Sequence, residues 1–185
     1  MIKVVGISGS LRKASYNTAL LNACRQQAPD AVSFEMLDLA DIPLYNADVH
    51  EKTTPEVVRS LHEAISNADG AIIATPEYNR SFSGVLKNAI DWLSKTPPQP
   101  FAGLPMLVIG ASPGAAGTMA ANYQLRQVLS VLDARMVTGM EFLLGSAADK
   151  LSADGTLTDA DTRERLGEHI DKLLELIALA PRHDH

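Results

Sequence analysis

The feature that most constrains the fold is an alternation of short apolar runs with longer segments of helical periodicity. The apolar, mostly β-branched runs predict strands over residues 3–7, 33–37, 70–75, 105–110 and 135–138. The helical patterns between and after them cover about 18–28, 55–67, 83–94, 118–132 and 159–180. Strands that alternate with helices in this way are typical of βαβ units and a parallel sheet.

Five such strands predict an α/β fold with a flavodoxin-like, doubly wound five-stranded parallel sheet of order 2-1-3-4-5. No repeat and no long linker interrupts the pattern, and 185 residues suit one domain. We therefore expect a single domain over 1–185, with a frayed tail at 181–185. In this fold ligands bind beyond the carboxyl ends of the strands, where the loops after strands one, three and four converge. Those three loops are also the ones with unusual composition.

The overall composition excludes several classes of function. A net charge of −6 argues against a general nucleic-acid binder, which usually carries a basic face. The single Cys24 has no partner for an intrachain disulfide and lies within an apolar helical pattern, so it is predicted to be a small buried hydrophobe. No apolar run is long enough to span a bilayer, and the amino terminus lacks a signal-peptide pattern. A cytoplasmic protein without nucleic-acid or membrane partners is expected.

The loop after the first strand is rich in hydroxyls, with Ser10, Arg12, Ser15 and Asn17 as candidate ligands. Neither a G-x-G-x-x-G fingerprint nor a G-K-[ST] sequence is present. Capping of the following helix by Ser15 or Asn17 would explain one of these residues but not the group. Hydroxyls and an arginine at a helix N-terminus suit a phosphate. A single terminal phosphate is therefore predicted, with FMN as the ligand.

The loop after the third strand has the composition to meet a flavin ring. Pro76 stiffens its start, and Glu77, Tyr78 and Asn79 supply polar groups and one amphipathic ring. An isoalloxazine needs hydrogen-bonding groups at its polar edge and an apolar or aromatic wall along its face. The alternative is an ordinary surface turn that begins the next helix.

The loop over residues 112–117 contains no large side chain, and Ser112 and Gly114 are its candidate ligands. Glycine permits positive φ and a close approach of the backbone to a planar ligand. The alternative is a tight strand-to-helix turn, which would need one glycine rather than two.

No side-chain catalytic site is predicted. The histidines avoid all three loops, and they are His50, His62, His169, His183 and His185. Neither an H-x-x-x-H nor a C-x-x-C spacing occurs, so no metal is expected. Glu77 is the one acid in the predicted cleft. A bound cofactor would therefore carry the chemistry while the protein positions it. Trp92, on a helical pattern, is predicted to lie in the core or a subunit interface rather than against the flavin.

Three blocks of sequence resemble the NADPH-dependent FMN reductase family, most of all its bacterial quinone and chromate reductases. They are Gly9-Ser10-Leu11-Arg12 with Ser15 and Asn17, then Pro76-Glu77-Tyr78-Asn79, then residues 84–92. The resemblance implies a flavodoxin-like fold, bound FMN, and two-electron reduction of quinones by NADPH or NADH in a ping-pong cycle. Chromate, azo and nitro compounds would be incidental acceptors.

The resemblance also implies roles for individual residues. In the first block Ser10, Arg12, Ser15 and Asn17 would hold the phosphate, and the residues of the second block would meet the ring and ribityl chain. Ser112 and Gly114 would approach the ring from the other side. Tyr123, Gln124, Arg126 and Glu141 match positions of a polar subunit network in tetrameric relatives, so a homodimer or homotetramer is expected. An exposed helix charge is the alternative for Arg126.

Arg80 departs from the family pattern, which places an aromatic residue after the asparagine. A cation there could pair with a phosphate of the nicotinamide cofactor, or with a neighbouring subunit. Two further classes of function stay open at this point: a flavodoxin-type electron carrier without NAD(P)H oxidation of its own, and a flavin-free binding module.

Overall fold

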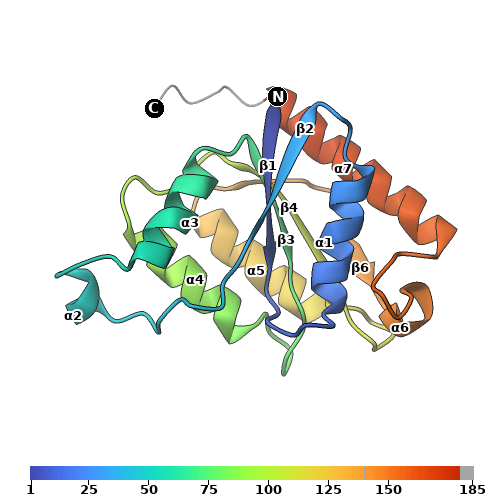
Figure 1. The fold of residues 1–185 in the computed structure, drawn as a ribbon, viewed down its shortest axis with the longest axis horizontal. Coiled ribbons are helices and arrows are strands. Elements are labelled where there is room, and N and C mark those ends of the chain that lie inside the picture. Colours follow the sequence, from blue (N-terminus) through green and yellow to red (C-terminus); the bar gives the residue numbers. More distant parts are fainter. Residues whose placement is uncertain (140, 180–185) are drawn as a thin grey trace.

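The computed structural model describes residues 1–139 and 141–179, in which a parallel sheet lies between two layers of helices (Figure 1). The strands are β1 (Ile2–Ser8), β2 (Val32–Leu37), β3 (Gly70–Ala74), β4 (Pro105–Ala111), β5 (Arg135–Met136) and β6 (Phe142–Leu144). Their order is β2-β1-β3-β4-β5, and all pairs are parallel. The predicted doubly wound order is confirmed. The predicted tail at 181–185 lies outside the described residues.

The fifth position of the sheet differs from the prediction because two short strands share it. β5 pairs with Pro105 and Met106 at the start of β4, and β6 pairs with residues 109–111 at its end. Gly139, between them, has a φ of 101°, a conformation that does not continue a strand. The expected five strands are therefore six. With only three residues, β6 is too short to show an alternation in the sequence.

In the part of the chain that the structure describes, five long helices cover the two faces of the sheet. α1 (Tyr16–Gln27) and α7 (Ala160–Leu179) lie on one face, and α3 (Glu56–Ser66), α4 (Gly84–Lys95) and α5 (Met119–Val131) lie on the other (Figure 1). Two single-turn helices, α2 (Ala47–His50) and α6 (Ala147–Lys150), lie in connections. None of the helices within the described residues combines the length and apolar character needed to cross a membrane.

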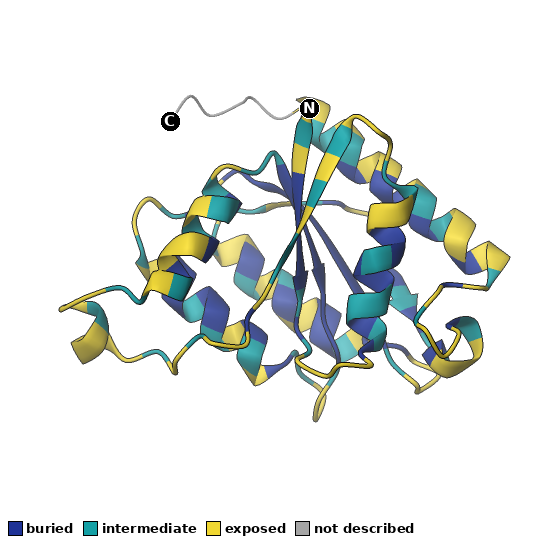
Figure 2. Cartoon of the chain, viewed as in Figure 1, coloured by how far each residue is buried: buried dark blue, intermediate teal, exposed yellow. Residues whose placement is uncertain are grey.

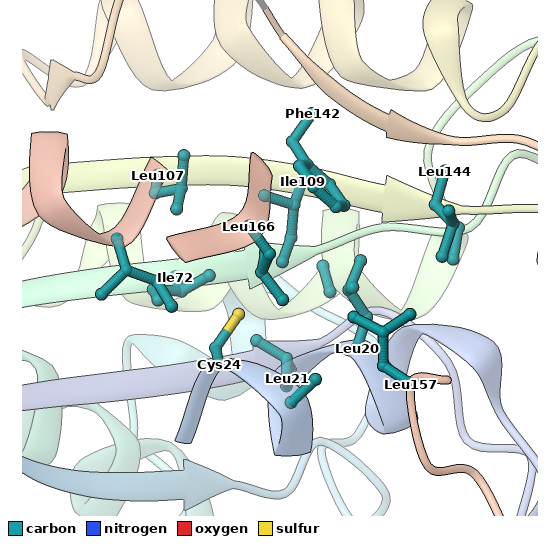
Figure 3. Packing of buried hydrophobic residues seen from close by; sticks show 14 of the residues in the cluster. Leu20, Leu21, Cys24, Ile72, Leu107, Ile109, Phe142, Leu144, Leu157 and Leu166 are labelled. Carbon is teal, nitrogen blue, oxygen red and sulfur yellow. The ribbon is translucent and has the colours of Figure 1, made fainter. Parts of the chain in front are cut away.

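Each helical layer buries its own apolar cluster against the sheet. β3 and β4 are buried along their whole length, as strands covered on both faces require (Figure 2). Leu21 and Cys24 of α1 belong to the same cluster as Ile72 of β3 (Figure 3). Cys24 is fully buried, as predicted, and burial raises the pKa of its thiol to about 12. A thiol with so high a pKa is not a nucleophile at neutral pH.

Residues 42–45, within the long segment after β2, are fastened to α4. Asn88 Oδ1 accepts a hydrogen bond from the Tyr45 N–H at 2.8 Å, and Trp92 Nε1 donates to the Pro43 carbonyl at 2.8 Å. Trp92 is fully buried and meets the rings of Tyr45 and His50 edge-on. Of its two predicted places, the core and a subunit interface, the structure shows the core.

Candidate functional site

The loops that follow β1, β3 and β4 meet at one edge of the sheet, as the topology predicts (Figure 1). They form a cleft lined by Ser10, Arg12, Ser15, Tyr16, Asn17, Pro76, Glu77, Tyr78, Ala111, Ser112 and Pro113. Of the residues predicted to contact FMN, all but Asn79 and Gly114 line it. No residue of the segment 38–54 is among the residues that line this cleft.

The cleft is shallow. It encloses about 60 Å³, whereas pockets that enclose a drug-sized ligand measure roughly 300–1,000 Å³. A ligand of that size would therefore extend from the enclosed part across the open mouth of the cleft.

The N-terminus of α1 opens into this cleft and is suited to an anion. Ser15 is the N-cap, and its Oγ accepts from the Thr18 N–H at 3.2 Å, which leaves its own hydroxyl proton for a ligand. The N–H groups of Tyr16 and Asn17 precede the first intrahelical bond. No acidic residue lies in the first turn, and exposed Arg12 lines the cleft. Capping by Ser15 and anion binding are therefore compatible.

The side chain of Asn17 is occupied within the protein. Its Nδ2 donates to the Ala111 carbonyl at 3.1 Å, and its Oδ1 accepts from the Ala111 N–H at 2.9 Å. Both bonds are buried, and they tie the start of α1 to the end of β4. Asn17 can therefore serve an anion through its backbone N–H, while its amide holds two walls of the cleft together.

The loop after β3 forms a two-residue hairpin. Tyr78 and Ser81 exchange backbone hydrogen bonds of 2.9 and 3.0 Å, and Asn79 and Arg80 between them have φ values of 51° and 66°. Positive φ at both central residues is the pattern of a type I′ turn. The turn projects Asn79 and Arg80 outward as exposed residues, so neither is among the lining of the cleft.

Helix α5 holds this hairpin at both ends. Glu77 Oε2 accepts from the N–H groups of Ala120 and Ala121 at 2.9 and 3.2 Å, in place of a side-chain cap from Thr118. Gln124 Nε2 donates to the Arg80 carbonyl at 2.7 Å, and Gln124 Oε1 accepts from the Ser81 hydroxyl at 2.7 Å. The one acid of the cleft is thus a helix cap. Gln124, matched above to a subunit network, bonds within its own chain.

The loop over 112–117 is hydrogen-bonded to the end of β6 and to the segment that follows it. Ser112 N–H donates to the Leu144 carbonyl at 2.9 Å, and the Gly114 carbonyl accepts from the Ser146 N–H at 3.2 Å. Gly117 has the positive φ predicted for this loop, at 65°. A Cβ at Gly145 would lie 2.2 Å from the Ala115 carbonyl oxygen, so glycine is required there for the two segments to touch.

Arg126 is half-buried and bonded, so the alternative of an exposed helix charge is wrong. Its Nε donates to Asn122 Oδ1 at 2.9 Å, and both terminal nitrogens donate to the Val137 carbonyl at 3.1 Å. Burial lowers its pKa, and the nearby charges of Glu141 and Tyr123 oppose that shift. The three residues predicted for a subunit interface therefore lie close together on this chain.

Three contributions to the site were not predicted. Tyr16 lines the cleft, Gln124 holds the hairpin, and Gly145 lets its own segment touch the third loop. The position of Tyr16 directly after a predicted cap was a usable signal, because the first helical N–H groups always lack intrahelical partners. The other two contacts join residues distant in the chain and leave no local pattern.

Comparison with known proteins identifies the family to which the chain belongs. The family model of NADPH-dependent FMN reductases matches residues 2–149. The chain belongs to the NADPH-dependent FMN reductase family. An NAD(P)H-dependent FMN reductase of Pseudomonas aeruginosa is 46% identical over 172 residues, covering 93% of each chain. A quinone reductase of Escherichia coli K12 is 42% identical over 179 residues, covering 95% of each.

Solved structures agree with this family assignment. The flavoenzyme NAD(P)H:(acceptor) oxidoreductase FerB of Paracoccus denitrificans superposes with a TM-score of 0.89 at 34% identity. The match covers 97% of this chain and 99% of that one. The resemblance drawn from the three sequence blocks is confirmed.

Proposed function

We propose that this protein is an FMN-dependent NAD(P)H oxidoreductase that reduces quinones by two electrons. The observation that carries the proposal is the α1 N-terminus, which opens with Arg12 into a cleft walled by the loops after β3 and β4. A helix N-terminus that has no acidic residue in its first turn and is flanked by an arginine suits a phosphate. Relatives at 40–46% identity are named as FMN and quinone reductases, which supports the choice of cofactor and acceptor.

The donor groups at this end of the cleft fit an FMN phosphate. Arg12 supplies a charged fork, Ser10 and Ser15 supply hydroxyls, and Tyr16 and Asn17 supply backbone N–H groups. When bound, FMN supplies two-electron redox chemistry, which no side chain of the cleft provides.

The remaining predicted residues hold the flavin ring. Pro76, Glu77, Tyr78 and Asn79 would present backbone groups and the Tyr78 ring at one side, because the hairpin keeps them in place. Ser112 and Gly114 would approach from the other side. Their proposed role is to orient the ring and keep water from it, while no side chain moves a proton.

Arg80 is proposed to contact either the electron donor or the electron acceptor. On the donor it would pair with a phosphate of the nicotinamide cofactor. It is exposed at the hairpin tip, and its backbone carbonyl rather than its guanidinium is held by Gln124. Its charge is therefore available to a ligand that enters above the cleft. Chromate, azo and nitro compounds would be incidental acceptors at the same place.

We further propose that the protein is a homodimer or homotetramer, with Tyr123, Arg126 and Glu141 at the interface. Tyr123 and Met119, one turn apart on α5, are 50% and 45% exposed. Light scattering coupled to gel filtration tests the mass, and a monomer would contradict this part. A cytoplasmic location remains a prediction from the sequence.

Anaerobic stopped-flow mixing of the purified protein with NADPH tests the function. We expect a yellow protein whose flavin absorbance bleaches rapidly and returns when a benzoquinone is added. A flavodoxin-type carrier would stay oxidised until a partner reductase is supplied. A colourless protein that takes up no added FMN at micromolar concentration would overturn the proposal altogether.

A further inference from the structure

A second cavity lies next to the proposed phosphate site and is larger than the cleft itself. Its volume is about 700 Å³, within the range of roughly 300–1,000 Å³ that holds a drug-sized ligand. It shares Arg12, Ser15 and Tyr16 with the cleft and continues from them along α1 to residues 148–155. The two cavities therefore meet at the N-terminus of α1.

The far wall of this cavity is built into the fold. Leu151 and Leu157 pair across a short hairpin, and both leucines are buried. The hairpin packs on α1, since a Cβ at Gly155 would lie 3.3 Å from the Ala19 side chain. This wall is thus in place before any ligand arrives.

The lining suits a phosphate followed by a ribose and a base. Arg12 and Lys13 are exposed cations near the end shared with the cleft. Arg12 lines both the cleft and the second cavity, whereas Lys13 lines only the second cavity. Leu151 and the small side chains of α1 and α6 give an apolar wall, and Asn22 adds an amide. Asp154 also lines this cavity; one of its carboxylate oxygens accepts from the Thr156 N–H at 3.0 Å, and the other is proposed to accept from a ribose hydroxyl.

We propose that this cavity accepts the adenylate half of FAD, so that the site binds FAD as well as FMN. FAD is FMN extended by AMP at its phosphate, and the cavity begins where that phosphate is placed. Arg12 would contact both phosphates, and Lys13 the outer one. The inference rests on the proposed FMN site, but it makes a separate claim about what lies beyond the phosphate.

Titration of the flavin-free protein with FMN, FAD and riboflavin, followed by flavin fluorescence, tests the proposal. The dissociation constant for FAD is expected within about tenfold of that for FMN, a difference of about 1.4 kcal/mol or less. A larger gap against FAD would overturn the inference and leave the FMN site intact. Failure to bind FMN would instead overturn the proposed function.

Variants of the second cavity locate the adenylate. Ala153 is exposed and lines the cavity, so Ala153→Trp places a large side chain where the adenylate would bind. The affinity for FAD should fall at least about tenfold, as much as the loss of one charged hydrogen bond would cause, while the affinity for FMN changes less than twofold. Lys13→Ala should lower FAD affinity about tenfold and leave FMN unchanged. The matched controls are Ala31→Trp and Lys95→Ala, exposed and outside both cavities. Equal losses of FMN and FAD in Ala153→Trp would show that the cavity does not hold the adenylate.

Discussion

Replacing Asn17 by alanine tests whether one buried amide holds the cleft together. The substitution removes the side-chain partner of two buried groups, the N–H and the carbonyl of Ala111. Leaving a buried donor or acceptor unsatisfied costs about 1–3 kcal/mol for each group. The higher helix propensity of alanine offsets at most about 0.7 kcal/mol of this destabilisation. For the two groups together, the expected net loss of stability is therefore about 1–6 kcal/mol.

This loss is measured on the flavin-free protein, so that cofactor binding does not contribute to the apparent stability. Urea unfolding should show a lower midpoint with an unchanged slope. For a domain of this size the melting temperature should fall by about 2–24 °C, at roughly 2–4 °C per kcal/mol.

The matched control is Asn22→Ala, five residues further along the same helix. Asn22 is half-buried, and its side chain makes no hydrogen bond within residues 1–139 and 141–179. Alanine there should leave stability unchanged or raise it by at most about 0.7 kcal/mol, through its higher helix propensity. If Asn17→Ala were no more destabilising than Asn22→Ala, the claim that this amide ties α1 to β4 would be refuted.

Four further predictions concern the site and the core. Arg12→Ala should weaken FMN retention during dialysis, since a charge-assisted hydrogen bond contributes about 1.5–3 kcal/mol, and Arg25→Ala at the other end of α1 serves as the control. Arg80→Ala should raise the KM for NADPH more than that for quinone, and equal effects would remove its proposed role. Arg80→Gly should raise thermal stability by about 1 kcal/mol, because glycine adopts its φ of 66° without strain. Cys24 should resist thiol reagents in the folded protein, and stability should fall as pH rises from 9.0 toward about 12, because the unfolded thiol loses its proton first. A Cys24→Ala variant that kept the same alkaline slope would contradict that assignment.

The sequence alone determined the layers of the fold and where its loops meet. β3 and β4 are continuous apolar runs because both of their faces are covered, and such runs are visible without tertiary information. The strand order then brings the loops after β1, β3 and β4 together at one edge. Ser15 could likewise be predicted as a cap, since its bond to the Thr18 N–H spans only three residues.

The tertiary structure decided what the polar side chains of those loops do. Asn17 bonds a residue 94 positions away, and Glu77 caps a helix 43 positions along the chain. Neither partner is marked by any local pattern, so both residues look like ligands when only their loops are considered. The split of the last strand and the cavity beside α1 likewise have no local sequence pattern, because both arise from the way distant segments pack. Hydrophobic periodicity is a local signal, whereas the partner of a buried hydrogen bond depends on which segments the fold brings within 3 Å or so of one another.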